Sequence, residues 1–390
     1  MFQSLSRSAV YVLIFLVSLL GAGDTGAAPP IETAARHAIL IEMETGAVLF
    51  EKDADTPIPP ASMSKLMTIY EVFAQLKSGA LKLDDTFTVG VDTWRKWRKL
   101  DGSTMFLNAG DKVTVEQLLR GIIVQSGNDA CDVIAIGLAG SIETFADWLN
   151  QRAAQIGLTD SHFTNPSGWP DPDHRMSVRD IAKLSERLIR EFPEYYHYFA
   201  EKSYTYAGVR QPNRNPLLFT MEGADGLKTG HTEASGYGLA ASAQREGRRL
   251  VLVFSGTSSM RERAREAERL MSYGFRNFKT YKLFDAGEVI DNAVVWLGDK
   301  ETVPLVVEQD VKLTLARTDR RDMTVRLVYD APLPAPIEKG QPVAVLEVSA
   351  PDMETVQIPV VAGDSSTKLT GFKRVKAAFN FLLWGASGLN

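Results

Sequence analysis

The pattern of apolar residues changes at about residue 280, and this change constrains the fold more than any other feature of the 390-residue chain. Before it, segments with a helical period, such as residues 142–157 and 177–192, stand apart from alternating segments that indicate strands. After it, short Val- and Thr-rich runs divided by Pro and Gly indicate strands. Because helices and strands segregate, we expect an α+β or α/β domain with an antiparallel sheet (residues 29–280), then a small all-β domain (residues 281–367).

The first 28 residues have the pattern of a secretory signal peptide. Arg7 precedes an apolar run from Ala9 to Leu20, and small residues follow as far as Ala28. We expect cleavage after Ala27 or Ala28, and therefore export. An uncleaved membrane anchor is the alternative, but this apolar run is short for a membrane span.

Charge and the rarer residue types exclude several classes of function. The chain has 43 basic and 48 acidic residues, so its charge does not favour nucleic acid as a partner. Cys131 lies in an apolar helical segment and is expected to be a small buried hydrophobe. The five histidines show no paired metal-binding spacing, so we expect neither a metal nor another cofactor.

A hydroxyl and an amine lie three residues apart at Ser62 and Lys65, within an otherwise apolar segment. In a helix, residues i and i+3 share a face, so the lysine could activate the serine as a nucleophile. Alternatively, Ser62 caps a helix and Lys65 extends to water. The same spacing recurs at Ser365 and Lys368 in a polar segment, so the pair is not specific by itself.

Three short motifs occur in a fixed order along the first domain. They are Ser62–Lys65 (SMSK) at the start of a helix, Ser126–Asn128 (SGN) between two apolar helices, and Lys228–Gly230 (KTG) on an expected strand. Each motif is weak alone, because Ser-Gly-Asn is also ordinary turn sequence. Together, and in this order, they match the S-x-x-K, S-x-N and K-T-G set of penicillin-binding proteins and β-lactamases.

The chain resembles the low-molecular-mass penicillin-binding proteins of the D-alanyl-D-alanine carboxypeptidase type. The resemblance covers nearly the whole mature chain and includes residues 43–55, 163–180 and 226–243 as well as the three motifs. It implies a β-lactamase-like peptidase domain followed by a β-rich domain. It also implies a serine peptidase that removes the terminal D-alanine from peptidoglycan stem pentapeptides and is inhibited by β-lactam antibiotics.

The resemblance also implies roles for the motif residues. Ser62 would attack the carbonyl of the penultimate D-alanine, a neutral Lys65 would accept its proton, and Ser126 would relay a proton to the leaving amine. The substrate-binding set would be Asn128, Lys228, Thr229, Gly230, His231 and Arg263. In this set Asn128 would hold the peptide amide, Lys228 would control the electrostatic field at Ser126, and Thr229 would bind the terminal carboxylate.

Two parts of this substrate-binding set need separate comment. The backbone N–H groups of Ser62 and His231 would form the oxyanion hole, so the His231 side chain is not expected to be a general base. The arginine near the carboxylate is expected to be Arg263, with Arg261 and Arg265 as rivals. An exposed helix with charged pairs is the alternative for each of these arginines.

Three other functions are weighed against the carboxypeptidase. A class A β-lactamase needs a glutamate that activates water, yet none lies between Glu143 and Glu186, and Gly127 replaces an aspartate of those enzymes. A D,D-endopeptidase would use the same groups on cross-linked peptides. A non-enzymatic cell-wall-binding protein predicts degraded motifs, whereas all three motifs are intact.

The tail of residues 368–390 has the pattern of an amphipathic helix. Its apolar stripe consists of Phe372, Val375, Phe379, Leu382 and Leu383, with Lys373 and Arg374 outside it. We expect this helix to lie on the membrane surface and to hold the enzyme in the periplasm, peripheral on the outer face of the bacterial inner membrane. A helix packed against the β domain is the alternative.

Overall fold

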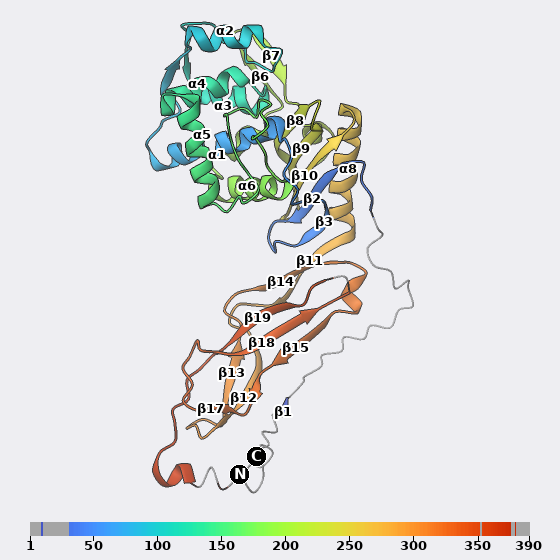
Figure 1. The fold of residues 1–390 in the computed structure, drawn as a ribbon. Helices are drawn as coiled ribbons and strands as arrows, with labels where there is room; N and C mark the ends of the chain where they lie inside the picture. The colour runs from blue at the N-terminus through green and yellow to red at the C-terminus, as the bar shows by residue number, and fades with distance from the viewer. Residues whose placement is uncertain (1–8, 11–30, 352, 376–378, 380–390) are drawn as a thin grey trace. The chain divides into compact units, whose positions relative to one another are not determined.

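The computed structural model describes residues 9–10, 31–351, 353–375 and 379 (Figure 1). Residues 31–276 form one compact unit, and the described residues from 277 onward form most of the other. We call them the catalytic unit and the β-rich unit. Apart from residues 9–10, the predicted signal peptide lies outside the described residues.

A five-stranded antiparallel sheet forms the centre of the catalytic unit. Its strand order is β3 (Val48–Lys52), β2 (His37–Glu42), β10 (Arg248–Thr257), β9 (Gly236–Arg245) and β8 (Ala224–Thr232). This confirms the predicted antiparallel sheet. Strand β8, which carries the K-T-G motif, forms one edge of it.

Both faces of this sheet are covered, which explains the unbroken apolar run of β10. Val251 and Val253 face the helical layer and belong to its core. On the other face lies α8 (Met260–Asn277), where a Cβ built on Gly274 would lie 2.7 Å from Leu250 and 2.9 Å from Leu40. Figure 1 shows α8 alongside the sheet.

The main helical layer consists of six elements. They are the 3₁₀-helix η1 (Ala61–Ser64) and helices α1 (Lys65–Ser78), α3 (Val115–Val124), α4 (Asn128–Ala139), α5 (Ile142–Gln155) and α6 (Val178–Glu191). The helical period predicted all of these segments except the 3₁₀ start at Ala61–Ser64. The α3–α4 interruption carries the S-G-N motif.

Smaller elements complete the catalytic unit. They are α2 (Val91–Lys99), α7 (Leu217–Thr220), η2 (Tyr196–Ala200) and the two-stranded pairs β4 (Thr86–Thr88) with β5 (Lys112–Thr114) and β6 (Ser203–Tyr206) with β7 (Val209–Pro212). Helix α2 was not predicted. Its sequence, VDTWRKWRK, is mostly polar, and only Thr93 and Trp97 are buried, so it lacks a wide apolar stripe.

The β-rich unit contains a six-stranded sheet in the order β15-β18-β19-β13-β12-β17, together with the separate pairs β11-β14 and β1-β16. The strands of the sheet are β12 (Val289–Trp296), β13 (Thr302–Val306), β15 (Thr324–Val328), β17 (Leu333–Pro334), β18 (Pro342–Ser349) and β19 (Val356–Ala362). The remaining elements are β1 (Ala9–Val10), β11 (Phe278–Phe284), β14 (Val311–Ala316), η3 (Asp319–Arg321) and β16 (Asp330–Ala331). Alternating apolar side chains from the strands form its own core.

Only the beginning of the predicted tail helix is described. Residues 371–375 and 379 are helical, and three members of the predicted stripe are exposed: Phe372 at 83%, Val375 at 65% and Phe379 at 60%. Leu382 and Leu383 lie outside the described residues. Within the described part of the chain, no helix combines the length and apolar character needed to cross a membrane.

Candidate active site

The three predicted motifs meet in one cleft of about 740 Å³ in the catalytic unit. Ser62 enters it from η1, Ser126 and Asn128 from the α3–α4 junction, and Thr229 from β8. These residues are far apart in the sequence. The fold therefore brings three motifs that are separate in the sequence together in one place.

Ser62 and Lys65 touch because the chain makes a 3₁₀ turn between them. In a 3₁₀-helix, residues i and i+3 eclipse each other, so the two side chains lie on one side. Lys65 Nζ is 2.8 Å from Ser62 Oγ. The preceding residue, Ala61, has a φ of 49°, a conformation that bulkier residues rarely adopt.

The amine of Lys65 is buried and surrounded by oxygen atoms. Besides Ser62 Oγ, it lies 2.7 Å from Asn128 Oδ1 and 2.6 Å from the carbonyl oxygen of Ser167. Burial disfavours the charged ammonium and lowers the pKa of Lys65 from 10.5 to about 8. A useful fraction of Lys65 is therefore a neutral base near physiological pH.

The Ser167 carbonyl reaches Lys65 because residues 163–176 are held tightly against the start of α1. Thr68 Oγ1 donates to the Pro166 carbonyl at 2.7 Å, and His174 Nε2 lies 2.6 Å from Ser64 Oγ. Gly168 packs so closely that a Cβ there would lie 2.0 Å from the Ala61 carbonyl oxygen. The sequence did not predict this support, because a backbone carbonyl leaves no mark on residue identity.

A second buried amine faces the hydroxyl of the second motif. Lys228 Nζ donates to Ser126 Oγ at 2.9 Å and to the Thr229 carbonyl at 3.1 Å. Burial, and then the charge of Lys65, lower the pKa of Lys228 well below its usual value. Ser126 has a φ of 62°, which places its side chain in the break between the two helices. The pair can hold or transfer a proton on the opposite side of the cleft from Lys65.

Gly230 and His231 extend the K-T-G strand along the cleft wall. A Cβ on Gly230 would lie 2.9 Å from the Pro60 carbonyl oxygen and 3.3 Å from Ala61 Cβ, so glycine allows β8 to approach the start of η1. The His231 ring stacks on Tyr237 with a centroid separation of 3.9 Å. Its side chain is therefore a part of the wall.

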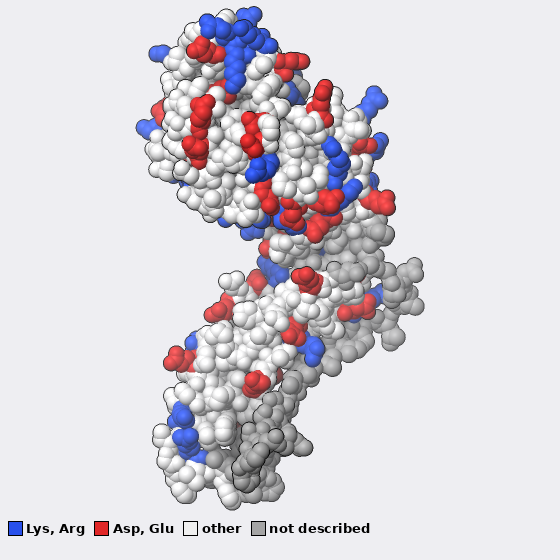
Figure 2. Space-filling model, in the orientation of Figure 1, with Lys and Arg blue, Asp and Glu red and all other residues white. Residues whose placement is uncertain are grey.

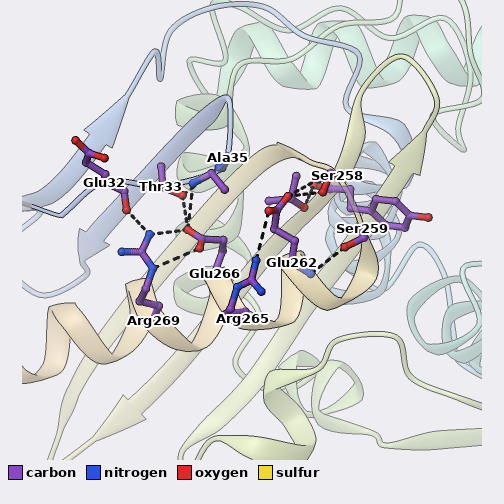
Figure 3. Close-up of polar contacts among 12 residues, drawn as sticks. Glu32, Thr33, Ala35, Ser258, Ser259, Glu262, Arg265, Glu266 and Arg269 are labelled. Atoms are coloured by element: carbon purple, nitrogen blue, oxygen red, sulfur yellow. Dashed lines mark hydrogen bonds and ion pairs between the residues drawn. The ribbon is translucent and has the colours of Figure 1, made fainter.

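The three candidate arginines on α8 differ sharply in position. Arg263 lines the cleft and is 6% exposed, whereas Arg261 is exposed and Arg265 is paired with Glu262 at 3.4 Å on the surface. Figure 3 shows Arg265 directed at Glu262, and Glu262 directed at Ser258. The exposed-helix alternative therefore describes Arg261 and Arg265 but not Arg263.

Arg263 is held with part of its guanidinium unsatisfied. Its Nη2 donates to the Arg214 carbonyl at 3.2 Å, while its buried Nε has no hydrogen-bond partner among the described residues. Burial, and then the charge of Arg214, lower the pKa of Arg263 to about 10. Arg263 therefore places a largely buried positive charge in the cleft wall, which favours an anionic group there.

Arg214 is a cleft residue that the sequence analysis missed. It lines the same cleft, and its Nη1 donates to Ser103 Oγ at 2.6 Å. It lies in an irregular segment before α7, where no motif or period marks it. Its cation adds to that of Arg263, so two arginines line the cleft that also contains Thr229.

Comparisons with known proteins match both parts of the chain to known families. Residues 24–259 match the family described as D-alanyl-D-alanine carboxypeptidase, and residues 278–368 match the family described as penicillin-binding protein 5, C-terminal domain. The D-alanyl-D-alanine carboxypeptidase DacC of Escherichia coli is 36% identical over 377 residues, which cover 96% of this chain and 94% of the relative. The relative named DacF from Bacillus subtilis is 29% identical over 373 residues, covering 93% of each chain.

Solved structures share this fold over most of the chain or over a part of it. Penicillin-binding protein 5 from Haemophilus influenzae superposes with a TM-score of 0.78 at 34% identity, covering 88% of this chain and all of the other. Penicillin-binding protein D2 from Listeria monocytogenes, solved in an ampicillin-bound form, superposes with a TM-score of 0.58 at 27% identity, covering 64% of this chain and all of the other. The resemblance seen in the three motifs thus extends to sequence and fold, and the chain belongs to the D-alanyl-D-alanine carboxypeptidase family of serine peptidases.

Proposed function

We propose that Ser62 is the nucleophile and Lys65 the base of this D-alanyl-D-alanine carboxypeptidase. The observation that carries the proposal is the set of three oxygens around Lys65 Nζ. A neutral amine has two N–H groups and one lone pair. If the oxygens of Asn128 and Ser167 accept the two N–H groups, the lone pair faces Ser62 Oγ, which is the geometry of a base.

In the acylation step, Ser62 Oγ attacks the carbonyl carbon of the penultimate D-alanine and its proton passes to Lys65. Backbone N–H groups of Ser62 and His231 stabilise the oxyanion. The C–N bond then breaks, and Ser126 relays the proton held by Lys65 to the departing D-alanine nitrogen, which leaves Lys65 neutral for the next step. Lys228, in contact with Ser126 Oγ, supports this transfer.

The carboxylate of the terminal D-alanine binds at the end of the cleft where the cations gather. We assign it to the hydroxyl of Thr229 and the guanidinium of Arg263, because both residues line the cleft. Asn128 holds the peptide amide. A free carboxylate is present only at a chain end, so this site selects terminal over internal peptide bonds.

Water then attacks the acyl-enzyme, again with Lys65 as base. Residues 163–176 place a backbone carbonyl, that of Ser167, against the Lys65 amine. The sequence has no glutamate between Glu143 and Glu186. A carbonyl cannot accept a proton from water as a glutamate can. This favours slow release of β-lactams, hence inhibition by them, over a β-lactamase function.

Two measurements on the signal-cleaved chain test the proposal. Benzylpenicillin should add one drug mass to the peptide that contains Ser62, and Ser62→Ala should abolish the adduct. A pentapeptide ending in D-Ala-D-Ala should release D-alanine faster than a cross-linked dimer is cleaved. An adduct on Ser126 would contradict the assignment of the nucleophile, and faster cleavage of the dimer would favour the endopeptidase.

We also propose a division of roles along the chain, in which residues 1–28 direct export, residues 29–280 carry catalysis and residues 281–367 form a β-rich domain. Residues 368–390 then hold the enzyme on the outer face of the inner membrane. The exposure of Phe372, Val375 and Phe379 supports an apolar stripe facing away from the β-rich core. Exposed apolar side chains next to Lys373 and Arg374 are typical of a helix that lies on anionic lipid.

Flotation of the signal-cleaved protein with anionic liposomes tests this attachment. The full chain should float with the vesicles, and a chain that ends at residue 367 should remain at the bottom. Phe372→Ser with Phe379→Ser should reduce flotation without deleting any residue. Equal flotation of the full and shortened chains would contradict the anchor.

A further inference from the structure

A second hollow, of about 320 Å³, lies beside the cleft between α2 and residues 104–108. Its wall includes the aromatic rings of Trp94, Trp97 and Phe106 and the guanidinium of Arg98. The mechanism proposed above uses none of these four side chains. Their arrangement therefore needs another explanation.

The hollow and the cleft share a wall. Residues 101–103 line the cleft, while Trp97 and Thr104 on either side of them line the hollow. The Trp97 ring also meets the Trp169 ring edge to face, with centroids 5.1 Å apart, and Trp169 lines the cleft. The hollow is therefore a direct neighbour of the cleft.

The fold presents Phe106 outward at the rim of this hollow. The backbone N–H groups of Met105 and Leu107, on either side of it, donate to the buried Asp129 carboxylate at 2.9 and 3.2 Å. Between these two bonds Phe106 has a φ of 64°, and 51% of the residue is exposed. A bulky residue rarely adopts this conformation, and here it keeps a large aromatic ring available to a ligand.

Polar and charged groups also line the hollow, together with the aliphatic side chains of Val89 and Leu107 and the Asp129 carboxylate. The guanidinium of Arg98 lies 5.1 Å from the centre of the Trp94 ring, and Thr104 and Asn108 add hydrogen-bonding side chains. Figure 2 shows Lys and Arg side chains gathered over α2, at the top of the view. Aromatic faces with a few polar groups at their edge match a sugar ring, which has apolar C–H faces and a rim of hydroxyl and amide groups.

We propose that this hollow binds a sugar residue of the glycan strand to which the stem peptide is attached. The inference rests on the proposed function, because a peptidoglycan substrate is what brings a sugar to this position. A stem of five residues spans at most about 18 Å when extended, so its sugar-bearing end stays near the cleft while its D-alanine end is at Ser62. The enzyme should therefore prefer glycan-linked stems over free peptides.

The test compares two substrates of the full signal-cleaved chain: a free pentapeptide and the same pentapeptide attached to a disaccharide. We expect kcat/KM to be about tenfold higher for the disaccharide-linked form, as one stacked aromatic contact with its polar partners can provide. Phe106→Ala and Arg98→Ala should each bring the ratio of the two kcat/KM values towards one. Phe219→Ala, at a phenylalanine of α7 that is 52% exposed and lies outside both hollows, should leave the ratio unchanged.

The outcomes separate this inference from the proposed function. Release of D-alanine from the free pentapeptide tests the proposed function alone, whatever the ratio of the two kcat/KM values. A wild-type ratio near one would overturn the sugar site, and so would a tenfold ratio that survives both Phe106→Ala and Arg98→Ala. Penicillin labelling of Ser62 in each variant checks that the catalytic centre remains folded.

Discussion

The catalytic and β-rich units have cores of very different chemical character. The catalytic unit buries Lys65, Lys228 and Arg263 at 0%, 2% and 6% exposure, beside several buried carboxylates. In the described part of the β-rich unit, the buried polar residues are Thr314, Asp319 and Ser366, and the rest of its core is aliphatic. Burying an amine or a guanidinium costs several kcal/mol unless it is well paired. The folded catalytic unit therefore bears a desolvation penalty for buried cations, which the described core of the β-rich unit does not contain.

A hollow of the β-rich unit differs in the same way from the cleft that holds the three motifs. The hollow of the β-rich unit, about 390 Å³, is lined by apolar side chains such as Leu283, Phe284 and Met323 and by four charged side chains that are not buried: Glu288, Asp291, Arg320 and Arg321. The cleft of the catalytic unit is lined by hydroxyls, amides and two arginines. Buried charge, rather than the presence of a hollow, therefore distinguishes the proposed reaction site in this chain. Four predictions test this difference: three substitutions, in order of their expected effect on acylation by benzylpenicillin, and one pH profile.

Lys65→Arg should have the largest effect. Arginine keeps the positive charge but cannot lose its proton near neutral pH, so we expect acylation to slow by about 10²- to 10⁴-fold, the usual contribution of a general base. Lys300→Arg, at a surface lysine of the β-rich unit paired with Asp364 at 2.5 Å, is the matched control and should leave the rate unchanged. Stopped-flow or mass-spectrometric labelling measures both. A normal rate in Lys65→Arg would assign the base to another group.

Arg263→Gln should have the next largest effect and should act mainly on substrate binding. Loss of a charged hydrogen bond to the substrate carboxylate costs about 1.5–3 kcal/mol, which corresponds to a rise in KM of roughly 10- to 100-fold. A smaller decrease is expected in the acylation rate, because β-lactams also carry a carboxylate. Arg265→Gln, two residues away on the exposed side of α8, is the control. Equal kinetic effects of the two variants would remove Arg263 from the carboxylate site.

The pH profile should show the buried amine directly. Burial lowers the pKa of Lys65 to about 8, and the neutral form is the one that acts as a base. Below that pKa each fall of one pH unit reduces the neutral fraction about tenfold, so the acylation rate should rise up to about pH 8 and level off above it. The second-order rate constant for benzylpenicillin between pH 6 and 9.5 measures this. A rate independent of pH across this range would contradict the assignment.

Leu305→Ala should have the smallest effect on acylation and a large effect on stability. Leu305 is fully buried on β13 in the core of the β-rich unit, and removal of such a side chain costs about 2–5 kcal/mol. Calorimetry should show a lower melting temperature for one transition, while the penicillin acylation rate stays within about twofold of the wild type. A fall in acylation comparable to that of Arg263→Gln would show that catalysis depends on the β-rich core, against the comparison drawn above.

Much of the fold followed from local patterns. The helical period located α1, α5 and α6, and the alternation with its Glu246-Gly247 turn located the hairpin of β9 and β10. Helix α2 was not predicted, because its sequence contains too few apolar residues to form an apolar stripe. The helical pattern from Ser62 did not reveal the 3₁₀ turn either, since both helix types place residues i and i+3 on the same side.

By itself, the sequence determined the order of the motifs, the change of pattern near residue 280 and the family resemblance, because these depend on residue types and short spacings. Only the tertiary structure decided which arginines face the cleft and what surrounds the base. The Ser167 carbonyl reaches Lys65 across 102 positions of sequence, and Arg214 meets Ser103 across 111. The physical reason is that such contacts depend on how distant segments pack, and a carbonyl or an unmarked arginine in a loop leaves no periodic signal in the sequence.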